Sequence, residues 1–358
     1  MPDLNAMRFQ AADYRVRLFL SVDLSGSTAF KNSKDGEARK AGATPNWVTV
    51  FQKFYSDFPG LFATEFQRQR NDSVGADTCP ELWKAVGDEL VFCGRVTNKK
   101  SCAVALDAFV KTLHKYRKRL SEQEVELDVK GAGWLAAFPE PNRTVQLRAK
   151  EDSLELLPAS EALELSADKE PFKFDFLGKA IDTGFRVASR AQRDRFVLSV
   201  QLARLLVNSG PDLSFGHQIR LERPSVLKGV NKNEPYPILY IDTMEHLRTQ
   251  TAKQLEREVL REGEAPSPAR LSDYLTAYCK VVGTDEITLK VDSATADVDA
   301  PESYAIHKEY ISEHLAGERK TEIDGEESGD VSVSTEEDYL EDASLSPLET
   351  TQEVPGGT

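Results

Sequence analysis

The sequence predicts an α+β fold in which helices pack on a mixed, mainly antiparallel sheet, followed by a C-terminal extension. Short apolar runs rich in strand-forming residues alternate with longer segments whose apolar residues recur at helical spacing. Two apolar arms surround Gly87-Asp88 between Glu81 and Val96, which is typical of a tight hairpin and therefore of antiparallel strands. Hydrophobic residues make up 40% of the 358 positions, which is enough for a packed core.

The first half of the chain predicts a strand and two long helices in addition to this hairpin. Arg17–Leu24 (RLFLSVDL) is an apolar strand segment interrupted by Asp23. Pro45–Arg70 carries apolar residues at helical spacing, and we expect Pro59-Gly60 to kink or split this helix. Ser101–Leu120 has one apolar side and predicts an amphipathic helix.

The second half predicts shorter elements around an insertion. Val125–Phe138 predicts a strand that contains two glycines, and the mixed Pro, Glu and Ser content of Pro139–Lys173 indicates an insertion with one short helix. The remaining predicted elements are a helix at Ile181–Arg193, a strand at Phe196–Ser199, a helical turn at Gln201–Val207, and strands at Ile219–Glu222 and Tyr236–Asp242 that flank a Lys228-Gly229 turn.

Three regions are expected along the chain. Residues 1–244 form the main domain, with the insertion at about 139–173; residues 245–318 form a helical, charged extension, and residues 319–358 an acidic, disordered tail. In the extension, Thr249–Glu264 predicts a charged helix, and apolar residues between Tyr274 and Val281 recur at helical spacing. Twelve acidic residues and no Lys or Arg follow from Thr321 onward, so the net charge of −14 falls to −2 for the rest of the chain.

Composition excludes several function classes. No basic run interleaved with aromatic residues appears, so we expect no nucleic-acid-binding surface. No stretch of 18 apolar residues and no signal-peptide pattern are present, so we expect a soluble, cytoplasmic protein that does not bind a membrane. The four cysteines form no CxxC pair and have no His at zinc-ligand spacing, which indicates reduced thiols.

The first segment with candidate chemistry follows the first predicted strand. Asp23 ends the strand, and the small residues Gly26, Ser27 and Thr28 lead toward a helix. Small residues let backbone N–H groups approach a phosphate closely, and a helix N-terminus favours negative charge. The same pattern is typical of an ordinary helix cap and turn, so alone it does not indicate a ligand.

The second segment is the predicted hairpin, whose tip carries Asp88. Gly-Asp is also a common turn dipeptide that needs no metal. However, the strand of Asp23 and this hairpin can pair in one sheet, which would bring the two carboxylates to the same edge. Two carboxylates together with substrate phosphates form a magnesium or manganese site of the kind used in phosphoryl transfer.

The third segment is Phe174–Arg186 (FDFLGKAIDTGFR), in which Asp182 and Arg186 lie four residues apart on one helix face. They either form a surface ion pair, worth about 0.2–0.5 kcal/mol, or leave Arg186 to neutralise charge on a transferred phosphoryl group. Helical spacing alone leaves both interpretations open.

These three segments, in this order, resemble motifs of the class III nucleotidyl cyclases, the family of most adenylyl and guanylyl cyclases. That family has an aspartate at the end of the first strand before a small-residue loop, and a second aspartate in a Lys-x-x-Gly-Asp hairpin, which Lys84–Asp88 reproduces. A third motif spaces Asp, Gly, Asn and Arg, and a later turn reads Leu-Lys-Gly. The matching residues are Asp175, Gly178, Asp182 (in place of Asn), Arg186, Leu227, Lys228 and Gly229, within a resemblance that covers roughly Arg17–Asp242.

The resemblance implies a cyclase-like fold, a nucleoside triphosphate substrate and a homodimer whose sites are shared across the interface. Asp23, Asp88 and the backbone carbonyl of Leu24 would hold two Mn²⁺ or Mg²⁺ ions per site. The implied substrate contacts are the Gly26-Ser27-Thr28 loop, Lys84 and Asp175 at the base, Asp182 at the ribose position, Lys228 at the terminal phosphates, and Arg186 of the other protomer at the transition state.

The change at Asp182 alters one implied contact. In the family, Asn at this place hydrogen-bonds the ribose and orients the reacting 3′-oxygen, whereas an ionised Asp only accepts hydrogen bonds. This either lowers activity or reflects a reshaped pocket.

Trp-Lys-x-x-Gly-Asp-Glu together with Ile-Asp-x-Gly-Phe-Arg is similar to the pyrimidine cyclases of bacterial Pycsar anti-phage defence. This similarity implies that UTP, or CTP, is converted to cyclic UMP or cyclic CMP, which acts on a separate cyclic-nucleotide-binding effector. One alternative is an adenylate cyclase that makes cyclic AMP, because Lys84 and Asp175 are the adenine-type pair of the family. A second alternative is a catalytically inactive cyclase-like binding module; the presence of both aspartates and Arg186 argues against it.

Overall fold

The computed structural model describes residues 4–33, 46–147, 156–208, 213, 215–243, 265–284 and 286–328, together with residues 252, 255 and 259. The chain forms two units, residues 1–315 and 316–358. Within the second unit, the described part is the end of the last helix, α10 (Glu302–Ser328). The helix expected at Thr249–Glu264 lies outside the described residues except for three positions, and so does the expected tail after residue 328.

The centre of the first unit is a sheet of seven strands in the order β2-β3-β1-β4-β7-β9-β8. All neighbouring strands pair antiparallel except β4 and β7, which are parallel. The predicted α+β class with a mixed, mainly antiparallel sheet is therefore confirmed. The strands are β1 (Arg15–Ser25), β2 (Glu81–Val86), β3 (Glu89–Val96), β4 (Asp128–Phe138), β7 (Arg195–Leu198), β8 (Ile219–Val226) and β9 (Pro235–Asp242).

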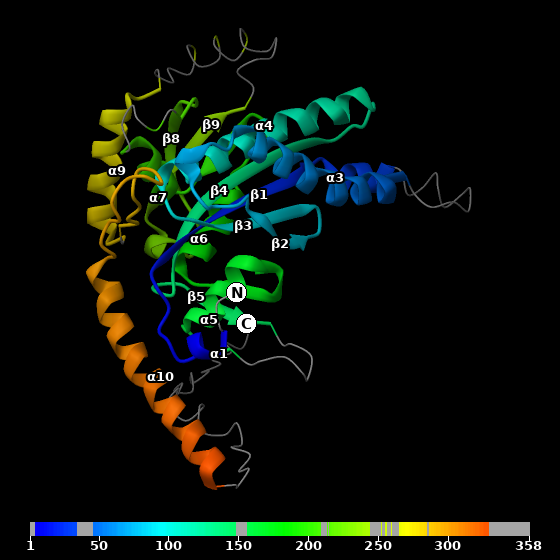
Figure 1. Cartoon of the computed structure of the whole chain (residues 1–358). Coiled ribbons are helices and arrows are strands. Elements are labelled where there is room, and N and C mark those ends of the chain that lie inside the picture. Colours follow the sequence, from blue (N-terminus) through cyan, green and yellow to red (C-terminus); the bar gives the residue numbers. More distant parts are fainter. Residues whose placement is uncertain are drawn as a thin grey trace, which may run out of the picture. The chain divides into compact units, whose positions relative to one another are not determined.

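Helices cover both faces of this sheet (Figure 1). On one face lie α3 (Asn46–Gln69), α4 (Lys99–Glu122) and α7 (Val200–Val207), with α9 (Pro268–Val282) packed on α7. On the other face lie α5 (Glu161–Lys169), α6 (Lys179–Ala188) and the hairpin of β5 (Arg143–Gln146) with β6 (Phe174–Leu177). The smaller helices are α1 (Leu4–Met7), a helix over 27–33, and 3-10 turns at Asp72–Val74, Pro171–Lys173 and Asn231–Asn233.

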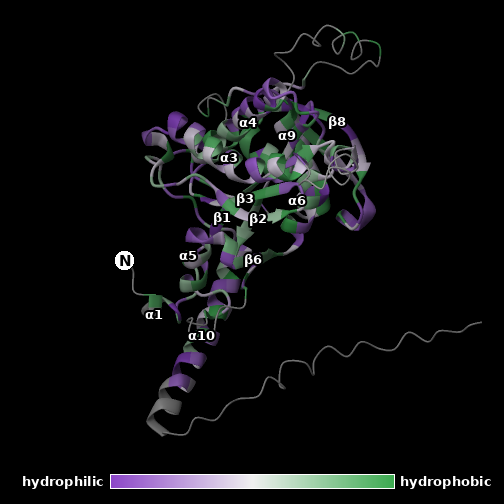
Figure 2. Ribbon diagram, turned by 90° about the vertical axis from the view of Figure 1, so that its right-hand side faces the viewer, coloured by the Kyte–Doolittle hydropathy of each residue, from purple (hydrophilic) through white to green (hydrophobic). Residues whose placement is uncertain are grey.

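The two faces of the sheet differ in chemistry because side chains alternate along each strand. Toward α3 and α4, the strands present aliphatic and phenylalanine side chains, and β3 is coloured as mainly hydrophobic in Figure 2. Toward α5 and α6, the middle of the face is aromatic: the rings of Phe19 and Trp134 stack with centroids 5.5 Å apart, and Trp83 and Phe176 surround them.

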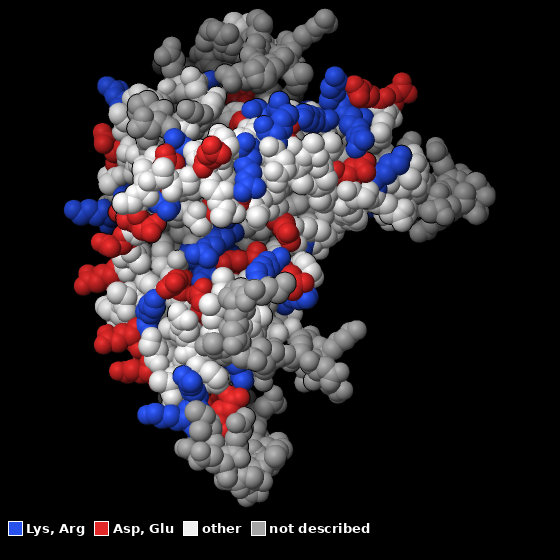
Figure 3. Space-filling model, in the orientation of Figure 1, with Lys and Arg blue, Asp and Glu red and all other residues white. Residues whose placement is uncertain are grey.

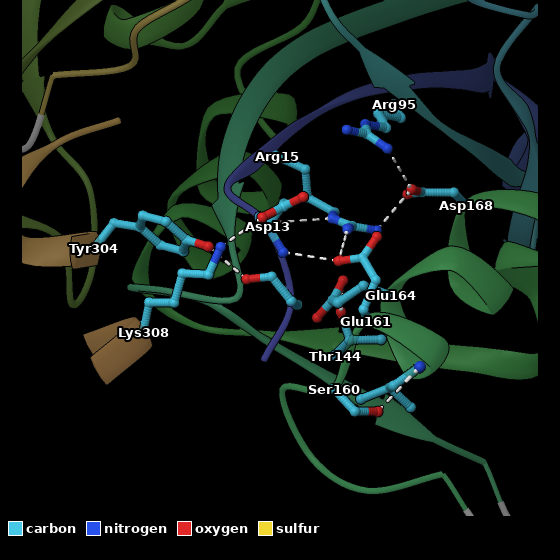
Figure 4. A network of polar contacts seen from close by, with 12 residues as sticks. Asp13, Arg15, Arg95, Thr144, Ser160, Glu161, Glu164, Asp168, Tyr304 and Lys308 are labelled. Atoms are coloured by element: carbon cyan, nitrogen blue, oxygen red, sulfur yellow. Dashed lines mark hydrogen bonds and ion pairs between the residues drawn. The ribbon is translucent and has the colours of Figure 1, made fainter. Parts of the chain in front are cut away.

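At one end of that second face, a buried ionic network fixes α5 to β1 (Figure 4). The Arg17 guanidinium is fully buried and donates to Glu164 Oε2 at 2.7 Å and to Asp168 Oδ1 at 2.6 Å. Arg15 contacts Glu161 at 2.6 Å and Asp168 at 3.0 Å. A buried guanidinium is stable only when it is paired and hydrogen-bonded, so these contacts set the position of α5.

The expected break at Pro59-Gly60 is wrong, because α3 continues from Asn46 through Gln69 with Pro59 inside it. A proline costs a helix one hydrogen bond, but five phenylalanines on one side of α3 are buried against the sheet and α4. Tertiary packing therefore outweighs the local cost. These residues are Phe51, Phe54, Phe58, Phe62 and Phe66.

Other differences concern the second half of the chain. The predicted insertion contains a helix, α5, as expected, but also the strand β5, which pairs with β6. The helix expected at Ile181–Arg193 ends at Ala188. The strands, hairpin and α4 match their predicted positions within a few residues. The long helix α10 was not predicted as a separate element, and it extends to Ser328, into the region expected to be the acidic tail.

The described surface carries both signs of charge. Basic and acidic side chains both occur on the face shown in Figure 3, and neither sign covers it. Among the described residues, no helix combines the length and the apolar character that a membrane span requires.

Candidate active site

The strand β1 and the β2–β3 hairpin bring Asp23 and Asp88 to the same end of the sheet. In the antiparallel register of β1 and β3, Asp23 is opposite Glu89, the residue after Asp88. The backbone N–H of Leu24 donates to the carbonyl of Asp88 at 3.2 Å, so the hairpin tip is fixed beside the end of β1. The backbone thus brings the two aspartates together at one end of the sheet, as expected.

The loop after Asp23 is joined to the hairpin by a side chain. Gly26 has a φ of +90°, a conformation that favours glycine, and the helix over 27–33 begins directly after it. The Ser27 hydroxyl is buried and donates to the Asp88 carboxylate. Gly26 and Thr28 are exposed, so the loop has polar groups that a ligand can reach, whereas Ser27 positions Asp88.

The charged groups around Asp23 come from three adjacent strands. Burial raises the pKa of Asp23; Lys130 on β4 opposes this effect and Asp88 adds to it. Burial also raises the pKa of Glu89. Lys130 is opposite Asp23 in the β1–β4 register, with its Nζ 3.5 Å from Asp23 Oδ1. Sequence reasoning missed Glu89 and Lys130, because finding them requires the pairing of β1 with both neighbours.

The donor atoms at this end of the sheet suit a hard divalent cation. Asp23, Asp88 and the Leu24 carbonyl offer only oxygen, which Mg²⁺ and Mn²⁺ prefer. Among the described residues, no group of three or more His, Cys, Asp or Glu side chains is arranged as a complete metal site. Magnesium is commonly held by one or two carboxylates plus substrate phosphates, so the donor set fits an ion that arrives with a nucleotide.

A second cluster of candidate residues forms where β2 approaches β6. The register of β2 against β3 shifts between Leu82 and Lys84, so Trp83 is an extra residue in the strand. Lys84 then points to the same face as Trp83 instead of the opposite one. Trp83 Nε1 donates to the Phe174 carbonyl at 2.9 Å, and Lys84 Nζ donates to Asp175 Oδ1 at 2.7 Å.

The turn between β6 and α6 depends on Gly178. Its φ is +136°, and a Cβ there would overlap the Asn142 side chain. Asn142 is buried and accepts from the Ala180 N–H at 3.1 Å while donating to the Ala137 carbonyl at 2.9 Å. This amide, which sequence reasoning missed, sets where α6 begins.

The helix α6 presents Asp182 in its first turn and Arg186 in its last turn, and both side chains are exposed. No ion pair is found between these two described side chains, so the structure gives no support to the interpretation as a surface pair. Gly184 packs directly on the Trp134 ring, which holds α6 against β4.

Lys228 lies apart from the other candidates. It is exposed in the turn after β8, beside Gly229 with a φ of +78°. The strand β8 is the sheet edge opposite β2 and lies four positions from β1. Within one chain, the sheet thus separates Lys228 from Asp23, while it brings Asp23 to Asp88 and Lys84 to Asp175.

No protein-family model matches the sequence, and no curated protein matches it. Among solved structures, the adenylyl cyclase CyaB from P. aeruginosa superposes with a TM-score of 0.44 and 12% identity, over 64% of this chain and 94% of that chain. The guanylate cyclase domain of RhGC from Catenaria anguillulae in complex with GTP gives 0.42 and 8%, over 64% and 98%. At these values the superpositions carry no conclusion about chemistry.

Two cavities adjoin the candidate residues without enclosing both aspartates. One of about 560 Å³ is lined by Trp83 and Lys84 together with Phe172. Another of about 1020 Å³ reaches Ser25 and Gly26 but includes neither Asp23 nor Asp88. A substrate site that uses both clusters therefore requires more surface than these cavities provide.

The four cysteines add no chemistry to the site. All are free thiols, as expected, and three of them are buried. Burial raises the pKa of Cys79 and that of Cys102 to about 12 each, so neither is a thiolate at neutral pH.

Proposed function

We propose that this protein is a nucleotidyl cyclase that converts UTP, or alternatively CTP, to the 3′,5′-cyclic nucleotide and pyrophosphate. The observation that carries this proposal is the placement of Asp88 beside Asp23 by the hairpin and the Ser27 hydroxyl. Two carboxylates alone do not indicate a ligand, but here they lie at a glycine loop that precedes a helix.

The proposed reaction needs positioning and charge stabilisation more than a side-chain base. Two bound Mn²⁺ or Mg²⁺ ions, held by Asp23, Asp88 and the Leu24 carbonyl, would activate the 3′-hydroxyl and stabilise the departing pyrophosphate. The exposed backbone of Gly26 and Thr28 binds phosphate, and Ser27 keeps Asp88 in place. Asp182 accepts a hydrogen bond from the ribose, and Arg186 and Lys228 neutralise phosphate charge.

A homodimer with sites shared between two chains explains why Asp23 and Lys228 lie far apart within one chain. Asp23 and Lys228 lie on distant parts of one sheet, and Arg186 is exposed without an acidic partner on α6. Near Asp175, the β5–β6 region also leaves apolar side chains 42–53% exposed, which a second copy would cover. These side chains are Val145, Leu147, Phe172 and Leu177.

The choice of base rests on the Lys84–Asp175 pair. An ammonium donor next to a carboxylate acceptor can contact a carbonyl and an N–H on the same base edge, as uracil offers. The same pair also suits an adenine edge, so adenylate cyclase activity is the second candidate. In the pyrimidine case, the cyclic nucleotide serves as a messenger that acts on a separate effector in anti-phage defence, and the protein acts in the cytoplasm.

Complementation between two inactive variants tests both the site and the dimer. Asp88→Ala removes a metal ligand and Arg186→Ala removes the transition-state cation, so each variant alone should lose cyclase activity while remaining folded. Random mixing of the two variants should restore about a quarter of wild-type activity, since half of the dimers then hold one intact site. Full activity of Asp88→Ala would refute the metal assignment, and no recovery on mixing would refute the shared site.

A further inference from the structure

Lys130 is the cationic side chain nearest to the Asp23 carboxylate. It lies on β4 directly opposite Asp23, and alternation along β4 places it on the same sheet face as Trp134 and Asp23. The side chains of Lys130 and Asp23 are 29% and 30% exposed, so the pair is open to solvent and ligands. The Nζ–Oδ1 distance of 3.5 Å is that of an ion pair.

Most of the charged side chains that face Lys130 are carboxylates. Asp23 and Glu89 interact with it directly, and Asp88 acts on both of these carboxylates. The other cation that acts on Asp23 is Lys31, in the helix over 27–33, whose ammonium lies over the Phe51 ring at 4.7 Å. Among the described residues, three carboxylates thus share mainly one ammonium group at this end of the sheet.

We propose, on the basis of the cyclase function above, that Lys130 is an exchangeable counter-ion that competes with the divalent metal for the Asp23 carboxylate. Without metal, its ammonium neutralises Asp23 and occupies space at Oδ1. A divalent cation placed there would repel the ammonium at close range, so the two cannot share that oxygen. Lysine has a flexible four-carbon stem, and this partly exposed side chain can turn away when metal binds.

This exchange favours metal that arrives with the nucleotide over free metal. Once displaced, the ammonium lies beside a site that then contains a triphosphate, whose negative charge stabilises it. Free metal binds without a triphosphate, so no added negative charge stabilises the displaced ammonium. Lys130 therefore acts as a positioning residue that lowers the affinity for free Mn²⁺ and makes metal binding depend on the substrate.

Binding of free Mn²⁺ to the nucleotide-free full chain tests this proposal without measuring activity. Lys130→Met should bind Mn²⁺ about tenfold more tightly than wild type at low salt, because it removes a nearby positive charge. Lys130→Arg keeps the charge and should stay near the wild-type affinity, and Lys130→Gln should behave like Lys130→Met. Lys118→Met makes the same charge change at an exposed position on α4 that pairs with Glu122, and it should leave Mn²⁺ affinity unchanged.

Asp23→Asn separates the failure of this inference from the failure of the proposed function. If Asp23→Asn abolishes Mn²⁺ binding but Lys130→Met binds no more tightly than wild type, the counter-ion role is wrong and the metal site stands. If no variant shows Mn²⁺ binding that depends on Asp23, either with or without UTP, the proposed metal site itself is wrong. Tighter binding in both Lys130→Met and Lys118→Met would also overturn the inference, because it would reflect net charge alone.

Discussion

Lys84 and Asp175 are 91 positions apart in the sequence, yet the Lys84 ammonium donates to Asp175 Oδ1 at 2.7 Å. The contact exists because the extra residue Trp83 in β2 turns Lys84 toward β6. Trp83 itself donates to the Phe174 carbonyl, so its ring fixes the strand next to Asp175. The Lys84 ammonium also lies 3.8 Å from the centroid of that ring, which limits its freedom.

Removing the Lys84 ammonium should lower kcat/KM strongly and change the free energy of unfolding only slightly. Lys84→Met should lower kcat/KM for the preferred triphosphate by about 10- to 100-fold, mainly through KM, because a charged hydrogen-bond donor to the base is lost. The pair is about one-third exposed, so the free energy of unfolding should change by less than about 1 kcal/mol. Steady-state kinetics and urea titration check this.

Lys173→Met is the matched control, since Lys173 forms an exposed pair with Glu170 at 2.7 Å close by. It should leave KM unchanged. An equal loss of kcat/KM in both variants would contradict a specific role for Lys84.

Tyr55 connects α3 to the tip of the hairpin. Its hydroxyl donates to the Gly87 carbonyl, directly before Asp88, and burial together with Asp88 raises the pKa of Tyr55. Tyr55→Phe should therefore raise the Mn²⁺ concentration needed for half-maximal activity by about tenfold, as loss of a contact behind a metal ligand does. Tyr310→Phe removes the hydroxyl of an exposed tyrosine on α10 and should have no effect. An unchanged Mn²⁺ requirement in Tyr55→Phe would show that the hairpin tip holds its position without this bond.

Gly184 determines how closely α6 approaches the sheet. An added Cβ would overlap the Trp134 ring, which is itself fully buried. Gly184→Ala should destabilise the protein by about 1–3 kcal/mol and lower activity, because it pushes away the helix that carries Asp182 and Arg186.

Gly60→Ala in α3 is the opposite case, since nothing lies within 4 Å of the added Cβ. It should stabilise the protein by up to about 1 kcal/mol and leave activity unchanged. Urea titration compares the stability of the two variants, and a stable, active Gly184→Ala protein would contradict the close packing of Gly184 on Trp134.

The ionic network between β1 and α5 makes stability depend on pH. Burial alone would raise the pKa of Asp168, but the charges of Arg17, Arg15 and Arg95 outweigh burial and lower it. A carboxyl group whose pKa is lowered by folding contributes stability above its unfolded value of about 4, and this contribution is lost as pH falls through the folded value.

The free energy of unfolding should therefore decrease below about pH 4, and Asp168→Asn should be less stable at pH 7 with a weaker decrease on acidification. Asp297→Asn removes an exposed carboxylate and should follow the wild-type curve. If the free energy of unfolding depends on pH in the same way in wild type and Asp168→Asn, the network does not lower the pKa of Asp168 in the folded state.

The sequence was sufficient to predict local elements and the approach of the two aspartates at one end of the sheet. The apolar run of Arg17–Leu24 and the Gly87-Asp88 turn are short-range signals, and they led directly to Asp23 and Asp88 at one end of the sheet. The extra residue Trp83 shows the limit. It shifts the register of β2 by one position, which no spacing within the strand reveals.

Glu89 and Lys130 could not be predicted as neighbours of Asp23, because their meeting depends on the register of three strands that are distant in sequence. The continuity of α3 through Pro59 likewise depends on burial of its phenylalanines by other elements. Local proline chemistry alone predicts the opposite result.

Product analysis with purified full-length protein tests the proposed pyrimidine cyclase activity most directly. Each of ATP, GTP, CTP and UTP is incubated separately with Mn²⁺, and the products of wild type and Asp88→Ala are identified by mass spectrometry. We expect cyclic UMP or cyclic CMP with pyrophosphate from wild type, and neither product from Asp88→Ala. Conversion of ATP alone would contradict the pyrimidine assignment, and no cyclic product from any of the four would contradict the cyclase assignment itself.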